Sequence, residues 1–85
     1  MHLTDLQDLA IQARVALIVG AKTFDRLFSV IRFDEVDEGI LIVYAKDDET
    51  ADEIEDNYAL QISIVASQIL KRDVSIVLVL PKVLQ

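Results

Sequence analysis

Residues 46–70, KDDETADEIEDNYALQISIVASQIL, decide the fold of this chain. Apolar side chains recur in this stretch at steps of three and four residues, at Ala51, Ile54, Tyr58, Ile62, Val65 and Ile69. That spacing places all of them on one side of an α-helix, within an arc of roughly 80°. We therefore predict a long helix here, with Tyr58 packed in the core at the middle of its apolar stripe.

Both ends of this stretch carry helix-terminus signals. Thr50 and Glu53 are three residues apart, as in a capping box, and Asp47 or Asp48 is an alternative cap. Acids gather at the start and two basic residues follow Leu70, an arrangement that suits the helix dipole.

Two shorter helices are predicted before this one. Thr4 and Gln7 match a capping box that opens a helix over residues 5–19, and Gly20 is a typical helix stop. Thr23 then caps a short helix whose apolar face is Phe24, Leu27, Phe28 and Ile31.

Three strands complete the pattern. Residues 32–36 are extended, residues 37–39 (Asp-Glu-Gly) signal a turn, and residues 40–45 form a β-branched apolar run typical of a central strand. Residues 73–80 repeat that signature until Pro81 ends it. The order α-α-β-β-α-β predicts a single α+β domain over residues 1–85, KH-like, with a three-stranded sheet covered by helices. The order of strands in the sheet cannot be deduced from this pattern.

The first predicted helix carries two apolar stripes. We assign to the core the stripe that holds most leucines, namely Leu6, Leu9, Ala10, Ala13 and Leu17. Ile11, Val15 and Ile18 then lie on nearly the opposite side, where they predict weak self-association of two chains. The alternative is that a terminal segment with Val83 and Leu84 covers them.

Composition excludes several classes of function. The net charge is −7, from 15 acids and 8 bases, so the chain is poorly suited to neutralising nucleic-acid phosphates. It has no cysteine, which excludes disulfides and thiolate metal sites. No apolar run approaches a membrane span and no signal peptide is recognisable, so a cytoplasmic location is expected.

Catalytic patterns are missing from the sequence as well. His2 is the only histidine, so the serines have no obvious activating base. Gly20 and Gly39 are the only glycines, which excludes a glycine-rich phosphate loop. The acids at 47–49 and 52 lack the glycine and the alternating spacing of a calcium loop. We therefore expect no enzyme, no cofactor and no metal site.

The chain resembles the N-terminal domain, domain I, of the bacterial replication initiator DnaA. The resemblance rests on Thr23-Phe24 opening a short helix, on residues 41–45 (LIVYA) after a hairpin, on Tyr58 thirteen residues later, and on residues 74–81 (VSIVLVLP). It covers about residues 6–82 and implies a protein-interaction module without ATPase or origin-binding activity. In the family this domain self-associates through its first helix and docks the replicative helicase and regulators of initiation.

The resemblance also implies positions for partner contacts. The two helicase-facing positions of the family correspond to Thr23 and Glu49, and both residue types differ from the family's acid and aromatic. With Asp48 and Asp52, Glu49 makes the expected partner surface more acidic than in the family. Four alternatives stay open: a KH-like nucleic-acid-binding domain, although the KH GxxG loop is missing, a clamp-loader-type polymerase subunit domain, a designed domain without function, and, least favoured, an enzyme.

Overall fold

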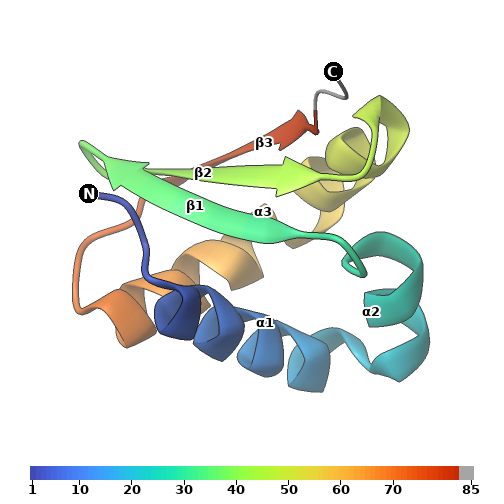
Figure 1. The fold of residues 1–85 in the computed structure, drawn as a ribbon, viewed down its shortest axis with the longest axis horizontal. Coiled ribbons are helices and arrows are strands. Elements are labelled where there is room, and N and C mark those ends of the chain that lie inside the picture. The colour runs from blue at the N-terminus through green and yellow to red at the C-terminus, as the bar shows by residue number, and fades with distance from the viewer. Residues whose placement is uncertain (83–85) are drawn as a thin grey trace.

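Three helices and three strands follow one another in the predicted order. In the computed structural model, which describes residues 1–82, they are α1 (Asp5–Val19), α2 (Ala21–Leu27), β1 (Arg32–Asp37), β2 (Ile40–Ala45), α3 (Asp48–Leu70) and β3 (Ile76–Pro81). The helices lie on one side of the sheet (Figure 1). The predicted α+β class and element order are confirmed, whereas Val83 and Leu84 lie outside the described residues.

The sheet is mixed, with strand order β1-β2-β3. β1 and β2 form the predicted antiparallel hairpin, whose turn has positive φ at Glu38 and Gly39 (50° and 80°). β2 is the central strand and pairs in parallel with β3 through the crossover of α3. A parallel pair requires such a crossover, which explains why the longest helix separates these two strands.

A β-bulge in β1 brings two residues of odd spacing to the same face. The pairing shifts between Phe33, opposite Val43, and Glu35, opposite Ile42, which leaves Asp34 as the extra residue. Phe33 and Val36 are three positions apart and would face opposite sides of a regular strand. Because of the bulge, both are buried against the helices.

α3 packs its predicted stripe against the sheet. Its buried residues include Ala51, Ile54, Ile62 and Val65, whereas Tyr58 is half-buried at the edge of the core. The cap is Asp47, which accepts a hydrogen bond from the Thr50 N–H at 2.8 Å, so the alternative cap is correct and not the Thr50 box. Aspartate at this position satisfies one of the free N–H groups of the first turn.

The faces of α1 are the reverse of the prediction. Its bounds and its Thr4–Gln7 capping box are confirmed. However, Ile11 and Val15 are 0% and 2% exposed and belong to the core, whereas Ile18 is half exposed, and the leucines assigned to the core point to solvent. Ile11 and Val15 therefore cannot form a self-association surface.

The physical reason for the reversal is Asp8. This residue is only 4% exposed, and its carboxylate accepts a hydrogen bond from the backbone N–H of Phe33 in β1. A buried N–H needs a partner, so the side of α1 that carries Asp8 faces the sheet. Ile11 and Val15 lie on that side and are buried with it.

α2 begins at Ala21, two residues before the predicted cap Thr23. Gly20 joins the two helices directly, since its N–H donates to the Ala16 carbonyl and its carbonyl accepts from the Phe24 N–H. With φ 86° and ψ 162°, Gly20 adopts a conformation that is essentially restricted to glycine.

None of the helices within residues 1–82 is long and apolar enough to cross a membrane.

Candidate functional site

The solvent side of α1 carries a row of leucines. Leu6, Leu9 and Leu17 are 77%, 59% and 82% exposed, and Ala13 between them is also exposed. By helix geometry these four positions fall within roughly 80° of one another, opposite the buried residues Ile11 and Val15. We name Leu6, Leu9, Ala13 and Leu17 the outer leucine row. A helix at the surface of a domain needs only one apolar face, so a second one indicates an interaction surface.

The neighbouring helix adds apolar side chains. α1 and α3 pack against each other, and the Arg14 guanidinium donates a hydrogen bond to Gln68 Oε1 at 3.3 Å across them. Leu60 and Ile64 of α3 are exposed as well. The layer of helices therefore presents apolar groups to solvent from both of its long members.

The orientation of the outer leucine row is set by polar bonds on the opposite side of α1. Asp8 accepts hydrogen bonds from Phe33 N at 2.9 Å and from Gln12 Nε2 at 3.1 Å to each of its oxygens. Arg32 Nη1 lies 3.4 Å from Asp8 Oδ2, and Gln12 Nε2 also donates to the Ile31 carbonyl at 3.2 Å. This network was not predicted from the sequence, although the polar residues Asp8 and Gln12 flank Ile11 on the same side of the helix and were its signal.

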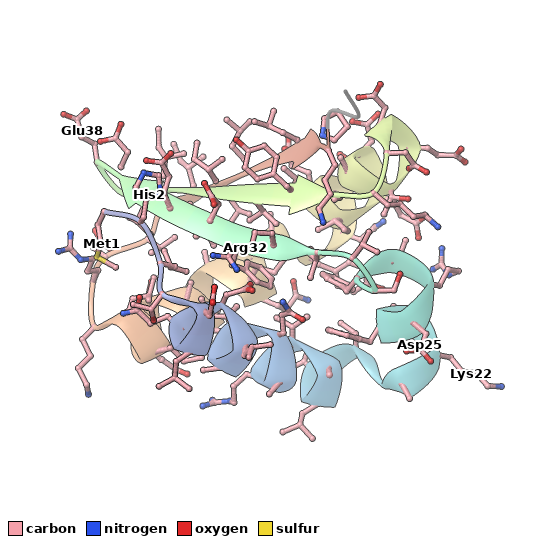
Figure 2. The ribbon with its side chains drawn as sticks, in the orientation of Figure 1. Met1, His2, Lys22, Asp25, Arg32 and Glu38 are labelled. Atoms are coloured by element: carbon pink, nitrogen blue, oxygen red, sulfur yellow. The ribbon has the colours of Figure 1, made fainter. Side chains whose placement is uncertain are left out.

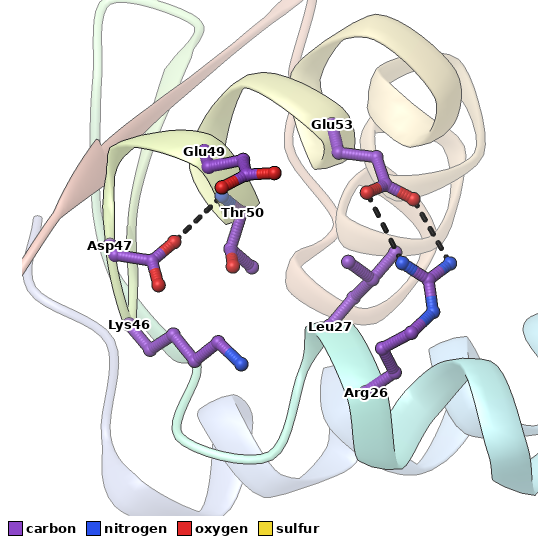
Figure 3. Close-up of a pocket in the computed structure, with 7 residues that line it drawn as sticks. All are labelled: Arg26, Leu27, Lys46, Asp47, Glu49, Thr50 and Glu53. Carbon is purple, nitrogen blue, oxygen red and sulfur yellow. Dashed lines mark hydrogen bonds and ion pairs between the residues drawn. The ribbon is translucent and has the colours of Figure 1, made fainter.

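A pocket lies where the end of α2 meets the start of α3 (Figure 3). It is lined by Arg26, Leu27, Lys46, Asp47, Glu49, Thr50 and Glu53. Arg26 and Glu53 pair through two contacts of 3.2 and 3.0 Å, and this hydrogen-bonded pairing raises the pKa of Arg26. Apart from Leu27 and Thr50 the lining is charged, with two basic and three acidic side chains.

The four predicted partner-binding residues lie on α2 and on the first two turns of α3. Glu49 lines the pocket, whereas Asp48 and Asp52 are exposed on the same helix outside the lining. Thr23 is half-buried within α2, one turn before Arg26. The structure thus brings Glu49 to the C-terminal end of α2 but does not place Thr23 in the pocket.

One group of side chains could supply three metal ligands. His2, Asp34 and Glu35 place ligand atoms within 4.8 Å of one another, the only such group among the residues described. His2 is exposed, and its Nδ1 lies 3.9 Å from Asp34 Oδ2. This proximity could not be predicted from the sequence, because His2 and Asp34 are 32 positions apart. An exposed group of this kind is common without an ion, so we assign it no function.

Comparison with known proteins leaves the function to be argued from these surfaces. No protein-family model matches the chain, and no curated protein is significantly similar to it in sequence.

Proposed function

We propose that this chain is a non-catalytic protein-interaction domain that self-associates through the outer leucine row of α1. The observation that supports the proposal is the exposure of Leu6, Leu9 and Leu17 on a helix whose other side is already buried. Self-association is thus proposed on the side of α1 opposite to Ile11, Val15 and Ile18, where the sequence pattern had predicted it.

The association should be weak. Each leucine left in water forgoes roughly 1.5–3 kcal/mol of favourable burial free energy. A two-fold pairing of α1 helices would bury the leucines of the row from both chains at once. Association also costs about 4–15 kcal/mol of free energy, because the two chains lose translational and rotational freedom. Repulsion between two chains of charge −7 also opposes the dimer, so salt should strengthen the association by screening it.

The biological process we propose is the initiation of DNA replication, which follows from the resemblance to DnaA domain I. In that setting the acids at the start of α3, Asp48, Glu49 and Asp52, would contact a helicase or a regulator of initiation. Thr23 and Glu49 replace the family's acid and aromatic, so a regulator is the better-supported partner. We do not propose nucleic-acid binding, since the charge of −7 opposes contact with phosphates.

Sedimentation velocity across micromolar to millimolar concentrations tests the self-association. We expect a concentration-dependent shift toward the dimer that Leu17→Glu abolishes. The matched control is Val30→Glu, because Val30 is an exposed apolar residue outside the helices and strands and the substitution changes the charge equally. A wild-type chain that stays monomeric in high salt, or a Val30→Glu variant as impaired as Leu17→Glu, would refute this function.

A further inference from the structure

The side of the sheet away from the helices is apolar over two strands. The pairing of β2 with β3 places side by side Ile40 and Ile76, Ile42 and Leu78, and Tyr44 and Leu80. The alternate residues of both strands are buried against the helices, so these six point to the other side, which we name the open sheet face. Figure 2 shows side chains standing on this side with no helix above them. Ile76 and Leu78 are 54% and 38% exposed.

This composition is typical of strands that are covered on both sides. A sheet with one side in water usually alternates apolar and polar residues, whereas parallel strands covered on both sides are apolar at every position. β2 (ILIVYA) and β3 (IVLVLP) pair in parallel and follow the second pattern. Within residues 1–82 the helices cover only one side of the sheet, so the open sheet face is available to a partner.

The free edge of β3 is obstructed at two positions for a further strand. Ile76 N donates to the Gly39 carbonyl and Lys82 N to the Ala45 carbonyl, and just before the strand Ser75 N also donates to Gly39. Within β3 the N–H groups of even-numbered residues therefore point to β2, and those of Val77 and Val79 point to the free edge. Of the odd-numbered residues, Val79 donates its N–H to the carboxylate of Glu55 at 3.0 Å, and Pro81 has no N–H to donate. These devices hinder edge pairing.

The opposite edge is obstructed as well. Along β1, Leu3 N donates to the Asp34 carbonyl at 2.8 Å and Val36 N donates to the Met1 carbonyl at 2.9 Å. The first residues of the chain thus occupy the edge that a partner strand would need. We therefore expect an occupant of the open sheet face to lie across the face and not to extend the sheet.

Acidic residues border the open sheet face on two sides. On β1, Glu35 and Asp37 pair with Ile42 and Ile40 and therefore share their face. Along the free edge of β3, the carboxylate of Glu55 reaches Val79, and Asp52 and Asp56 are exposed within one turn of Glu55 on α3.

Positive groups also lie near the face. Arg32 of β1 is engaged by Asp5 and Asp8 at 2.9 and 3.4 Å. Lys82 follows the end of β3 and is exposed. The Met1 ammonium donates to the Val36 carbonyl of β1 at 3.0 Å. Acids nevertheless stand on both long sides of the face, Glu35 and Asp37 on β1 and Glu55 beside β3.

We infer that the open sheet face docks an amphipathic helix of another protein that is apolar on one side and carries lysines or arginines on both flanks. A helix about 10 Å across covers two strands spaced about 4.8 Å apart, and its flanking bases would reach the acids of β1 and α3. A second copy of this chain fits poorly, because two-fold pairing would bring the acidic borders together. The face is also only about 20 Å long by strand geometry, which makes its footprint smaller than the roughly 800 Å² per partner of a stable dimer.

The probe for this inference is a fluorescent peptide of about 18 residues, long enough to be partly helical alone, with leucines on one side and lysines elsewhere. Its partner control is the same peptide with glutamates in place of lysines. Fluorescence anisotropy should show saturable binding of the lysine peptide and about tenfold or weaker binding of the glutamate peptide. Equal binding of both peptides, or none of the lysine peptide, would overturn the inference.

Two matched double variants locate the binding site. Ile42→Ser with Leu78→Ser removes apolar area from the open sheet face without changing charge and should weaken binding of the lysine peptide about tenfold, a change of about 1.4 kcal/mol. Leu9→Ser with Leu17→Ser makes the same chemical change on the outer leucine row and should leave peptide binding intact while abolishing self-association. The opposite pattern would overturn the inference, whereas failure of self-association alone would bear only on the proposed function.

A third measurement keeps the result interpretable if the sheet variant unfolds. Amide chemical shifts of the wild-type chain, titrated with the lysine peptide, should change along β2 and β3 and leave the outer side of α1 unchanged. Changes confined to α1 would contradict the inference. If sedimentation shows that the sheet variant, while folded, has lost the dimer, the face is covered by a second copy and the inference is wrong.

Discussion

The carboxylate of Asp8 accepts a hydrogen bond from the backbone N–H of Phe33 at 2.9 Å, and this bond connects the inner side of α1 to the bulged part of β1. Phe33 follows directly on Arg32, which also contacts Asp8. A single buried carboxylate therefore fixes which side of α1 faces the sheet and, with it, which side presents the outer leucine row.

Removing this carboxylate should destabilise the domain strongly. Asp8→Ala leaves the Phe33 N–H buried without its acceptor and deprives Arg32 of one partner, so we expect a loss of about 2–4 kcal/mol in the free energy of unfolding. The control is Asp5→Ala, which removes the exposed partner of the same arginine and should have little effect. Urea denaturation of both variants measures the difference, and equal effects would contradict the orienting role of Asp8.

The aromatic cluster at the end of the core gives a second prediction. Phe28 is fully buried and stacks on Phe24, with the ring centroids 5.6 Å apart. Tyr58 is half-buried and meets Phe28 edge-to-face, with the ring centroids 5.8 Å apart. Phe28→Ala should cost about 3–5 kcal/mol, and Tyr58→Ala clearly less, because less of its ring leaves contact with the core. Thermal denaturation ranks the two variants. A Tyr58→Ala effect as large as that of Phe28→Ala would place the tyrosine deeper than the structure does.

The joint between α1 and α2 gives a third prediction, one that contacts alone would miss. No atom lies within 4 Å of a Cβ added at Gly20, yet its φ of 86° and ψ of 162° are unfavourable for any L-residue. Gly20→Ala should therefore cost about 1–3 kcal/mol through backbone strain alone. A chain synthesised with D-alanine at this position should lose far less, because the D-residue favours this conformation. If both alanines behave alike, strain is not the cause.

Local signals in the sequence were sufficient for the elements but not for their faces. The stripe of α3, the apolar run of β2 and the Thr4–Gln7 box each involve residues close in the chain, and each was predicted correctly. The choice between the two apolar sides of α1 depends on a contact between Asp8 and Phe33, which are 25 residues apart. Since both sides are about equally apolar, periodicity alone could not decide between them.

The candidate surfaces show the same division. The sequence showed that α1 has a second apolar side that its own core does not need. However, Ile11 and Val15, two of the residues predicted to form that side, are buried in the core. The open sheet face was not predicted, because an apolar run such as residues 40–45 fits a strand covered on both sides. Only the strand order and the placement of all helices on one side reveal that half of those residues lack a cover.

The last prediction concerns acid stability and the cap of α3. Hydrogen bonds from Thr50 to the Asp47 carboxylate hold the pKa of Asp47 below its ordinary value of 3.8. A carboxylate with a lowered folded pKa stabilises the folded chain fully above its unfolded pKa, and this stabilisation is lost as the pH falls through the lower folded value. Asp47→Asn keeps a side-chain oxygen that can cap the helix, but its amide does not take up a proton in this pH range. The advantage of the wild type over Asp47→Asn should therefore be constant near neutral pH and shrink below about pH 4.

Many other acids titrate in the same range, so the test compares variants and not the wild-type curve alone. Asp48→Asn is the matched control, because it makes the same chemical change one residue later in the first turn without removing the cap. Thermal denaturation of the three chains from pH 7 to pH 2.5 gives the melting temperature of each. The gap between wild type and Asp47→Asn should close on acidification, and the gap for Asp48→Asn should be smaller throughout. A gap for Asp47→Asn that stays constant down to pH 2.5 would show that the ionised form of Asp47 gives α3 no advantage over a neutral cap.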